Sequence, residues 1–343
     1  MPEPNRMKAV GYKIPGSLER QDALLDLEIA PPSPGSRDLL VAVAAISVNP
    51  VDTKIRRSTP APEGAFKILG WDVSGRVEAV GDAVSGFKPG DQVFYSGTIT
   101  RPGANSAFHL VDERLAGHAP KSLSHAEAAA LPLTSVTAWE MLFDRLDIPK
   151  PVPGAANAIL IIGGAGGVGS IAIQLVRALT DVTVIATASR PETREWVTSL
   201  GAHHVIDHTK PLAAQIEALG LGAPAFVFST TETHRHLAEV AALIAPQGRF
   251  GLIDDPETLD VMGFKRKAVS IHWELMFTRS LFETPDMAEQ GKILDRVAAL
   301  VDEGKIKTTL NEVLTPINAA NLKKAHAILE SGKAKGKIVL EGF

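Results

Sequence analysis

One glycine-rich stretch constrains the fold of this chain more than any other. An apolar run, Ala158–Ile162, leads into Gly163–Gly169, and a helical apolar periodicity then continues to Leu179 before a second apolar run over 182–188. The order of strand, glycine turn, helix and strand is the context in which G-x-G-x-x-G binds a dinucleotide. The stretch therefore predicts a nucleotide-binding β-α-β unit.

The glycines of this stretch have distinct expected roles. We expect Gly164 to permit the tight turn, Gly166 to let the backbone approach a pyrophosphate, and Gly169 to let the helix press against its strand. The first residues of the helix, Gly167 and Val168, bring exposed N–H groups and the positive end of the helix dipole to the bound anion.

The end of the second strand indicates which nucleotide binds. An NAD site usually has Asp or Glu about 20 residues past the first glycine, whereas here Ser189 and Arg190 precede the first carboxylate, Glu192. A hydroxyl and a guanidinium suit a 2′-phosphate, because Arg offers charge-assisted, bidentate hydrogen bonds. The sequence therefore favours NADP(H) over NAD(H). The alternative is that Ser189 only precedes or caps the helix begun by Pro191, with Arg190 in solvent.

The length of 343 residues is large for one core and predicts two domains. Strands without intervening helices dominate the first 125 residues or so, which indicates a β-rich barrel or sandwich. Strands then alternate with helices, which predicts a doubly wound parallel sheet and an α/β protein. The strands of that sheet are expected near 158–162, 182–188, 204–206, 225–229, 249–253 and 268–273.

Charge and composition exclude several classes of partner. The net charge of −4 gives no case for nucleic acid, and no apolar run or leader indicates a membrane span or secretion. We therefore expect a cytoplasmic protein. The chain has no Cys, which removes disulfides, thiolate nucleophiles and Cys-ligated zinc.

Several further motifs follow one another along the chain: Val48–Lys54, Gly70–Gly75, Phe87–Val93, Ala129–Thr134, Thr137–Trp139 and Gly336–Leu340. With these motifs and the glycine stretch, the chain resembles the medium-chain dehydrogenase/reductase superfamily, and more narrowly its zinc-independent quinone-reductase branch. The chain is particularly similar to a bacterial group called zinc-type alcohol-dehydrogenase-like proteins, which share Ala186–Pro191 and His272–Glu274.

The resemblance implies a GroES-like catalytic domain at both chain ends and a Rossmann NADP(H)-binding domain between them. We expect the first over 1–130, completed by 305–343, and the second over 131–304. The resemblance also implies a homodimer in which the last Rossmann strand, around Val269–Trp273, pairs with its twin.

The residues at the zinc positions of related alcohol dehydrogenases predict that this chain binds no metal. It has Asn49 in place of Cys, Trp71-Asp72 in place of His-Glu, and Leu133-Thr134 where Cys or Asp would stand. A catalytic zinc needs three ligands from Cys, His and carboxylates, and one Asp does not supply them.

The absence of a metal-ligand set narrows the expected chemistry. Without Lewis acidity, hydrogen-bond donors must stabilise oxyanion charge, which favours quinones and α,β-unsaturated carbonyls as hydride acceptors from NADPH. The enzymatic alternative is a dehydrogenase of alcohols or aldehydes. The non-enzymatic alternative is an NADPH-binding sensor.

The resemblance and the sequence together suggest roles for individual side chains. Asn49 is expected beside the nicotinamide ribose and the substrate oxygen, or else as a loop residue that bonds backbone. Asp52 is expected to orient that loop, and Tyr95 to donate to the substrate carbonyl or line its pocket. The expected cofactor contacts are Thr137 to the nicotinamide, the backbone of Ile253 and Asp254 to the carboxamide, and Lys337 to the phosphates.

Overall fold

The structure, a computed structural model, describes residues 6–343, which form two compact units. The first unit comprises the described residues up to Leu133 together with Phe277–Gly304 and Thr308–Phe343. The second unit comprises Thr134–Met276 and Lys305–Lys307. None of the helices in residues 6–343 is both long and apolar enough to cross a membrane.

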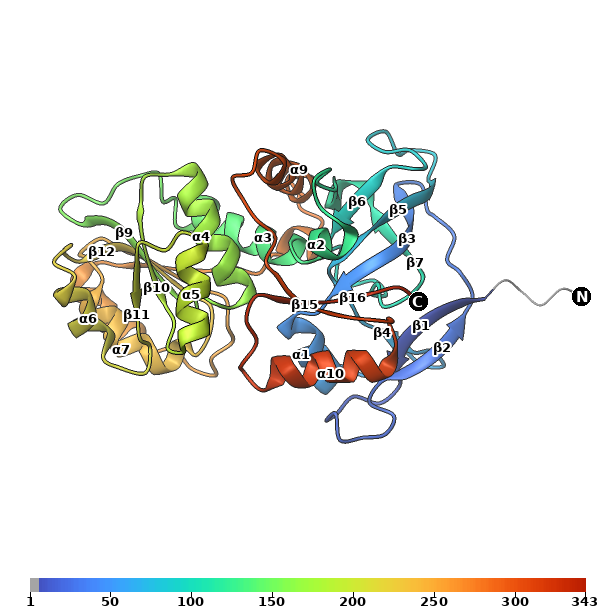
Figure 1. The fold of residues 1–343 in the computed structure, drawn as a ribbon, viewed down its shortest axis with the longest axis horizontal. Helices are drawn as coiled ribbons and strands as arrows, with labels where there is room; N and C mark the ends of the chain where they lie inside the picture. Colours follow the sequence, from blue (N-terminus) through green and yellow to red (C-terminus); the bar gives the residue numbers. More distant parts are fainter. Residues whose placement is uncertain (1–5) are drawn as a thin grey trace, which may run out of the picture. The chain divides into compact units, whose positions relative to one another are not determined.

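The first unit is built on two sheets of mostly antiparallel strands (Figure 1). In the larger sheet the last strand of the chain lies between two others, pairing in parallel with β15 and antiparallel with β3. The strands of this sheet, in spatial order, are β15 (Leu310–Leu314), β16 (Lys337–Glu341), β3 (Asp38–Ser47), β5 (Val73–Val80), β6 (Gln92–Tyr95) and β8 (Ala116–His118), with β7 (Phe108–Asp112) paired to β3 off this path. The smaller sheet contains β2 (Leu25–Ile29), β1 (Met7–Tyr12) and β4 (Lys67–Ile68).

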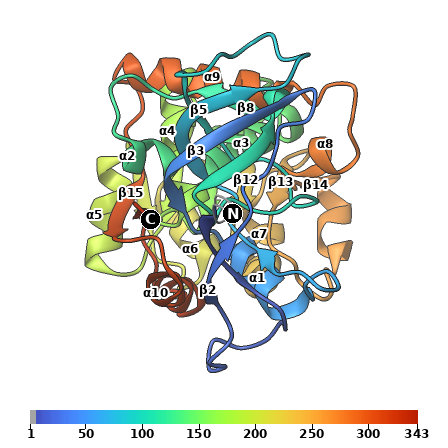
Figure 2. The same cartoon turned by 90° about the vertical axis from the view of Figure 1, so that its right-hand side faces the viewer.

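Helices pack around these sheets. Helix α1 (Pro50–Ser58) lies beside α10 (Ala319–Glu330) (Figure 1). Helix α9 (Glu289–Asp302) lies along β8, as Figure 2 shows. The shorter helices of this unit are η1 (Glu113–Leu115), α2 (His125–Ala129) and α8 (Thr278–Leu281).

Helix α9 belongs to the first unit, although the sequence analysis ends the Rossmann domain only at residue 304. Its close approach depends on two glycines, because a Cβ on Gly117 would lie 2.6 Å from Leu294 and one on Gly291 would lie 2.6 Å from the Ala116 carbonyl. The helix is also anchored by hydrogen bonds, since Asp295 accepts from the His118 N–H at 2.8 Å. Such contacts leave no local signal in the sequence, which is why sequence patterns alone did not assign α9 to the first unit.

The second unit contains one six-stranded parallel sheet with the spatial order β11-β10-β9-β12-β13-β14. The order reverses between β9 and β12, which is the switch point where such sheets bind ligands at their carboxyl ends. The strands are β9 (Ala156–Ile162), β10 (Thr183–Thr187), β11 (His204–Ile206), β12 (Pro224–Ser229), β13 (Arg249–Leu252) and β14 (Ser270–Trp273). The helical segments are α3 (Pro132–Trp139, whose first two residues belong to the first unit), η2 (Glu140–Arg145), α4 (Gly167–Leu179), α5 (Pro191–Ser199), α6 (Leu212–Ala218), α7 (Thr233–Leu243) and η3 (Val261–Lys267).

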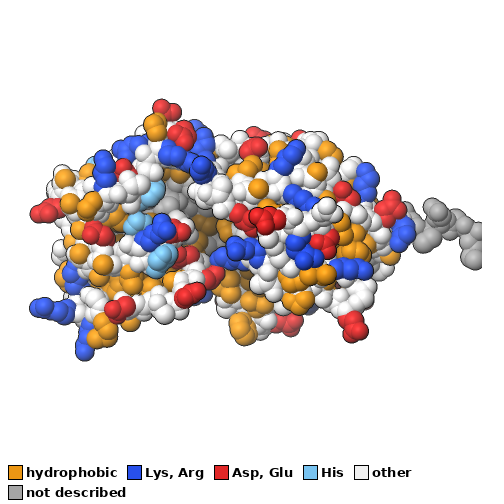
Figure 3. Space-filling view, turned by 90° about the horizontal axis from the view of Figure 1, so that it is seen from below, with side chains coloured by type: hydrophobic (Ala, Val, Ile, Leu, Met, Phe, Trp, Pro, Cys, Tyr) orange, Lys and Arg blue, Asp and Glu red, His pale blue; other side chains and the backbone are white. Residues whose placement is uncertain are grey.

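The observed elements confirm the predicted α/β class, with a GroES-like sheet domain and a Rossmann-like parallel sheet. Helix α4 buries Ile171, Leu175 and Val176 of the face that its periodicity predicts, whereas Leu179 at its end is 40% exposed. On the face shown in Figure 3, basic and acidic side chains are interspersed. This mixture accords with the small net charge of −4.

Candidate functional site

The glycine turn between β9 and α4 has the shape that the sequence motif predicts, with one change of roles. Gly163, not Gly164, adopts the left-handed conformation of the turn, with a φ of +81°. A Cβ on Gly164 would instead lie 2.9 Å from Ala186 on the neighbouring strand. A Cβ on Gly169 would lie 2.3 Å from the Gly163 carbonyl, so Gly169 does permit the close approach of helix and strand.

The start of α4 fits the pyrophosphate of a dinucleotide. Gly166 is the N-cap, and a Cβ there would meet only the Gly163 carbonyl, at 3.4 Å. Gly166, Gly167 and Val168 are all partly exposed. The first N–H groups of a helix have no acceptor within the helix, and together with the helix dipole they attract an anion.

Ser189 and Arg190 lie at the carboxyl end of β10, next to this turn. The Thr187 hydroxyl, at the end of β10, accepts a hydrogen bond from the Gly163 N–H at 3.0 Å and so joins the two segments. Arg190 is the N-cap residue of α5, and its Nε lies 3.1 Å from Glu192 Oε1. The Arg190 side chain is 39% exposed, which leaves it accessible to a phosphate. Arg190, and not Ser189, holds the N-cap position of α5, and its contact to a 2′-phosphate stays a prediction.

The remaining cofactor residues of the second unit occupy different kinds of position. Thr137 is buried on α3. Ile253 and Asp254 directly follow β13 and are partly exposed, at the carboxyl edge expected for the nicotinamide half. The Asp254 carboxylate accepts hydrogen bonds from the Thr233 N–H and hydroxyl and so caps α7, which leaves the backbone as the group to contact the carboxamide.

A buried polar cluster occupies the centre of the first unit. Asn49 donates to Asp72 Oδ2 through Nδ2 at 2.8 Å, and Lys337 Nζ lies 2.9 Å from the same oxygen. The other carboxylate oxygen of Asp72 accepts from the Leu133 N–H at 2.7 Å. Burial raises the pKa of Asp72, and the Lys337 charge opposes that shift. We name this set, Asn49, Asp72 and Lys337, the amide–carboxylate–lysine cluster.

Asp52 orients the loop that carries Asn49, as the sequence analysis expects. It accepts from the Asn49 N–H at 2.7 Å and from the Gly70 N–H at 3.0 Å, and so closes a capping box at the start of α1. Burial raises the pKa of Asp52 to about 7, and the hydrogen bonds from Asn49 and the Lys337 charge oppose that shift.

The cluster gives Lys337 and Asn49 roles different from those expected. The Lys337 side chain is 4% exposed, and its ammonium contacts the Val48 carbonyl, Asn49 Oδ1 and Asp72, so it is directed into the first unit and not toward cofactor phosphates. Both polar atoms of the Asn49 amide are used in the cluster. A contact from Asn49 to ribose or substrate therefore stays a prediction that would require this amide to exchange partners.

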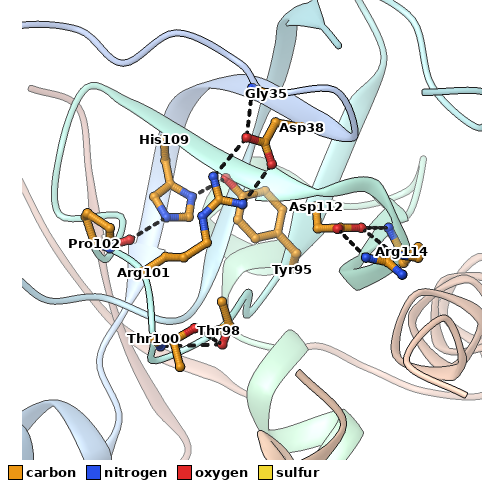
Figure 4. A network of polar contacts seen from close by, with 10 residues as sticks. All are labelled: Gly35, Asp38, Tyr95, Thr98, Thr100, Arg101, Pro102, His109, Asp112 and Arg114. Carbon is orange, nitrogen blue, oxygen red and sulfur yellow. Dashed lines mark hydrogen bonds and ion pairs between the residues drawn. The ribbon is translucent and has the colours of Figure 1, made fainter. Parts of the chain in front are cut away.

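Tyr95 is the residue whose expected role the structure changes most (Figure 4). Its side chain is wholly buried, and its hydroxyl lies 3.0 Å from His109 Nδ1. His109 Nε2 lies 3.0 Å from the Pro102 carbonyl, which only accepts, so Nε2 carries the proton and Nδ1 accepts from Tyr95. Burial lowers the pKa of His109 to about 4 and raises that of Tyr95, which keeps both side chains neutral. The Tyr95 hydroxyl therefore already donates its proton to His109 within the first unit, and the geometry assigns Tyr95 a structural role.

The same network fixes the loop over residues 96–105. Arg101 donates to both carboxylate oxygens of Asp38 at 2.7 and 2.9 Å, and Asp38 also accepts from the Gly35 N–H at 3.0 Å (Figure 4). Trp71 holds the other side of the loop by donating from Nε1 to the Thr98 carbonyl at 3.1 Å. Neither Asp38 nor Arg101 was identified from the sequence, because their ion pair joins residues 63 positions apart and leaves no local pattern.

The residues at the expected metal positions do not fit zinc. Among residues 6–343 no group of three or more His, Cys, Asp or Glu side chains is placed to hold a metal ion. At the positions that correspond to zinc ligands in related alcohol dehydrogenases, Asp72 is the one carboxylate, and it is already bonded to Lys337. Trp71 and Leu133 offer no ligand atom. Zinc sites use three or four N, O or S ligands, so the donor set is insufficient.

Comparisons with known proteins place both units in one group of oxidoreductases. A family model for the alcohol dehydrogenase GroES-like domain matches residues 35–137, and one for zinc-binding dehydrogenases matches residues 200–340. A zinc-type alcohol dehydrogenase-like protein of Staphylococcus aureus is 38% identical over 338 residues, which cover 97% of this chain and 99% of the relative.

Two further relatives extend the range of named activities. The 2-methylene-furan-3-one reductase of Solanum lycopersicum is 30% identical over 357 residues, which cover 98% of this chain and 79% of the relative. A Rhizobium etli protein, whose crystal structure is described as that of a candidate zinc-dependent alcohol dehydrogenase, is 66% identical to this chain in sequence. The two structures match with a TM-score of 0.97 over 99% of each chain.

Proposed function

The chain belongs to the medium-chain dehydrogenase/reductase superfamily, and we propose that it is an NADPH-dependent reductase that transfers hydride to a quinone or an α,β-unsaturated carbonyl without a metal ion. Membership makes it an oxidoreductase that uses a nicotinamide cofactor. The proposal adds the phosphorylated form of the cofactor and the class of acceptor.

The residues of the second unit support the choice of cofactor. Gly166, Gly167 and Val168 form an open helix start for the pyrophosphate, and Ser189 and Arg190 stand at the end of β10 for a 2′-phosphate. Bound NADPH would supply the hydride, and the protein would orient and shield it. The Arg190 guanidinium can donate the bidentate, charge-assisted hydrogen bonds that distinguish a phosphate from a hydroxyl.

The amide–carboxylate–lysine cluster is the observation that carries the choice of acceptor. Because its donor set does not fit zinc, polarisation of the acceptor oxygen falls to hydrogen bonds, which contribute a few kcal/mol each. Conjugated acceptors need least from the protein, since they spread the developing charge over their own π-system. A relative named for the reduction of 2-methylene-furan-3-one, an α,β-unsaturated ketone, supports this class.

Steady-state oxidation of NADPH and NADH with a panel of quinones, enones, saturated aldehydes and alcohols tests the proposal. We expect turnover of quinones or enones with NADPH, unchanged by a chelator. Turnover restricted to alcohols or saturated aldehydes would establish the dehydrogenase alternative. Micromolar NADPH binding without turnover of any acceptor would establish the sensor.

The coenzyme preference has its own test in Arg190→Ala. Loss of hydrogen bonds to a charged phosphate costs about 1.5–3 kcal/mol, so NADPH should bind roughly 10- to 150-fold more weakly. NADH binding should stay unchanged. Arg235→Ala is the matched control, because Arg235 is also an exposed arginine of the second unit paired with a nearby glutamate. Equal losses for both coenzymes in Arg190→Ala would contradict the phosphate contact.

A further inference from the structure

All three N–H donors of the Lys337 ammonium are used within the amide–carboxylate–lysine cluster and the loop beside it. A lysine ammonium has three N–H donors, and here three oxygens accept them: the Val48 carbonyl at 2.9 Å, Asn49 Oδ1, and Asp72 Oδ2 at 2.9 Å. The side chain is 4% exposed and that of Asp72 is 0% exposed, so water does not compete for these contacts.

The carboxylate that faces the ammonium is equally saturated. Asp72 Oδ2 accepts from Lys337 and Asn49, and the Ser47 hydroxyl lies 3.4 Å away. Its other oxygen accepts from the Leu133 N–H. A metal ion at Asp72 would therefore have to displace a buried cation that is covalently part of the chain.

The position of this cluster in the sequence makes the saturation informative. The resemblance described in the sequence analysis places Asn49 and Asp72 at positions where zinc alcohol dehydrogenases carry ligands, and Lys337 reaches them from β16. We propose that the ammonium of Lys337 is the resident cation of this cluster, holding the oxygens of Val48, Asn49 and Asp72 in place of a metal ion and excluding zinc.

The proposal gives Lys337 a positioning role. Through Asn49 Oδ1 and the Val48 carbonyl the ammonium holds the loop that precedes α1, and through Asp72 it holds the segment that precedes β5. The neighbouring carboxylate, that of Asp52, accepts its hydrogen bonds from two backbone N–H groups and not from the Lys337 ammonium. Asp72 is therefore the carboxylate that pairs with Lys337, at 2.9 Å. The inference rests on the metal-free part of the proposed function and is independent of which acceptor is reduced.

Zinc binding by the unmodified protein is the first test. The untagged chain is dialysed against zinc chloride at neutral pH and its metal content is measured by elemental mass spectrometry. We expect no stoichiometric site at zinc concentrations up to roughly 10 µM, a level well above the dissociation constants of protein-bound zinc. One zinc per chain that is lost in Asp72→Asn would overturn the proposal, whatever the enzyme reduces.

Chemical rescue is the second test and does not require turnover. Lys337→Ala removes the atoms beyond Cβ, which correspond to propylammonium. We expect the variant to unfold at a lower temperature than the unmodified protein, and propylammonium chloride to raise its midpoint by several degrees. Propan-1-ol, of the same size but uncharged, and sodium chloride at equal ionic strength should not raise it. Lys333→Ala, which truncates an exposed lysine near the same strand, should respond to none of them.

An isosteric variant separates charge from packing. Lys337→Met keeps the length of the side chain and removes the ammonium, so it should be destabilised as strongly as Lys337→Ala and should not respond to propylammonium. A Lys337→Met protein as stable as the unmodified one would show that the side chain only fills space and would refute the proposal. If neither variant can be purified in folded form, the zinc measurement on the unmodified chain still decides. Failure of the quinone and enone assays would affect neither test.

Discussion

Tyr95→Phe tests whether the tyrosine is a hydrogen-bond donor to the substrate or part of the framework. The change removes the hydroxyl that donates to His109 Nδ1 at 3.0 Å and leaves that nitrogen buried without a donor. A lost hydrogen bond with an unsatisfied buried partner costs about 1–3 kcal/mol. The Pro102 carbonyl and the ion pair between Arg101 and Asp38 still hold the loop, so we expect lower stability without release of the loop.

The assay for this prediction combines unfolding with kinetics. We expect the midpoint to fall by about 2–4 °C for each kcal/mol, as is usual for domains of 150–250 residues. The kcat with NADPH and the best acceptor should change less than about threefold, whereas removal of a donor to an oxyanion lowers kcat by about 10²–10³-fold. A double-mutant cycle with His109→Leu should give a coupling energy of about 0.5–3 kcal/mol. A hundredfold loss of kcat at unchanged stability would refute the structural role.

Three further predictions concern other parts of the molecule. Gly166→Ala should keep the stability of the protein, because the new Cβ meets only the Gly163 carbonyl, at 3.4 Å. It should weaken NADPH binding at least tenfold, because Gly166 is expected to let the backbone approach the pyrophosphate. Gly169→Ala, whose Cβ would lie 2.3 Å from the same carbonyl, should also lower the unfolding midpoint. Burial raises the pKa of Asp52 to about 7. The folded protein therefore favours protonated Asp52. The contribution of Asp52 to the free energy of unfolding is full below the unfolded pKa of about 4 and is lost as pH rises through about 7, by up to about 4 kcal/mol. The difference in the free energy of unfolding between the unmodified protein and Asp52→Asn, followed from pH 5 to 8, measures this loss, and a difference that does not change with pH would contradict the assignment. We propose that β14 pairs with the β14 of a second copy in a homodimer, because it is an edge strand of its sheet. Trp273 on this strand is 56% exposed, so Trp273→Asp should halve the mass measured by light scattering. An unmodified protein that is monomeric would exclude this interface.

The elements of the second unit were predictable because their signals are local. The turn at Gly163–Gly169, the apolar strands around it and the helical face of α4 all lie in one continuous stretch, Ala156–Thr187, and follow from backbone sterics and periodicity. Helix α1 was also predictable in principle and was missed. Asn49 as N-cap, Pro50 at N1 and Asp52 at N3 form a capping signature that the polar composition of the helix obscured.

The partners within the candidate site were not predictable from local patterns. Lys337 contacts Asp72 across 265 positions in the sequence, and the sequence analysis assigned this lysine to phosphates instead. Tyr95 and His109 are 14 positions apart on strands that do not pair with each other, so neither alternation nor turn chemistry joins them. Burial and hydrogen-bond saturation decide such roles, and both are properties of the folded chain.

The place of β16 has a consequence for how this protein is made. A nascent chain that has synthesised β3 still lacks the neighbour that pairs with residues 45–47, because β16 is synthesised long after β3. The second unit is nearly continuous in sequence and is available for co-translational folding, while the first must wait with an unpaired strand edge. A stop codon before Lys337 would remove both β16 and the lysine that binds Asp72. Loss of β16 would therefore disrupt the first unit, even though this strand lies far in sequence from the nucleotide motif.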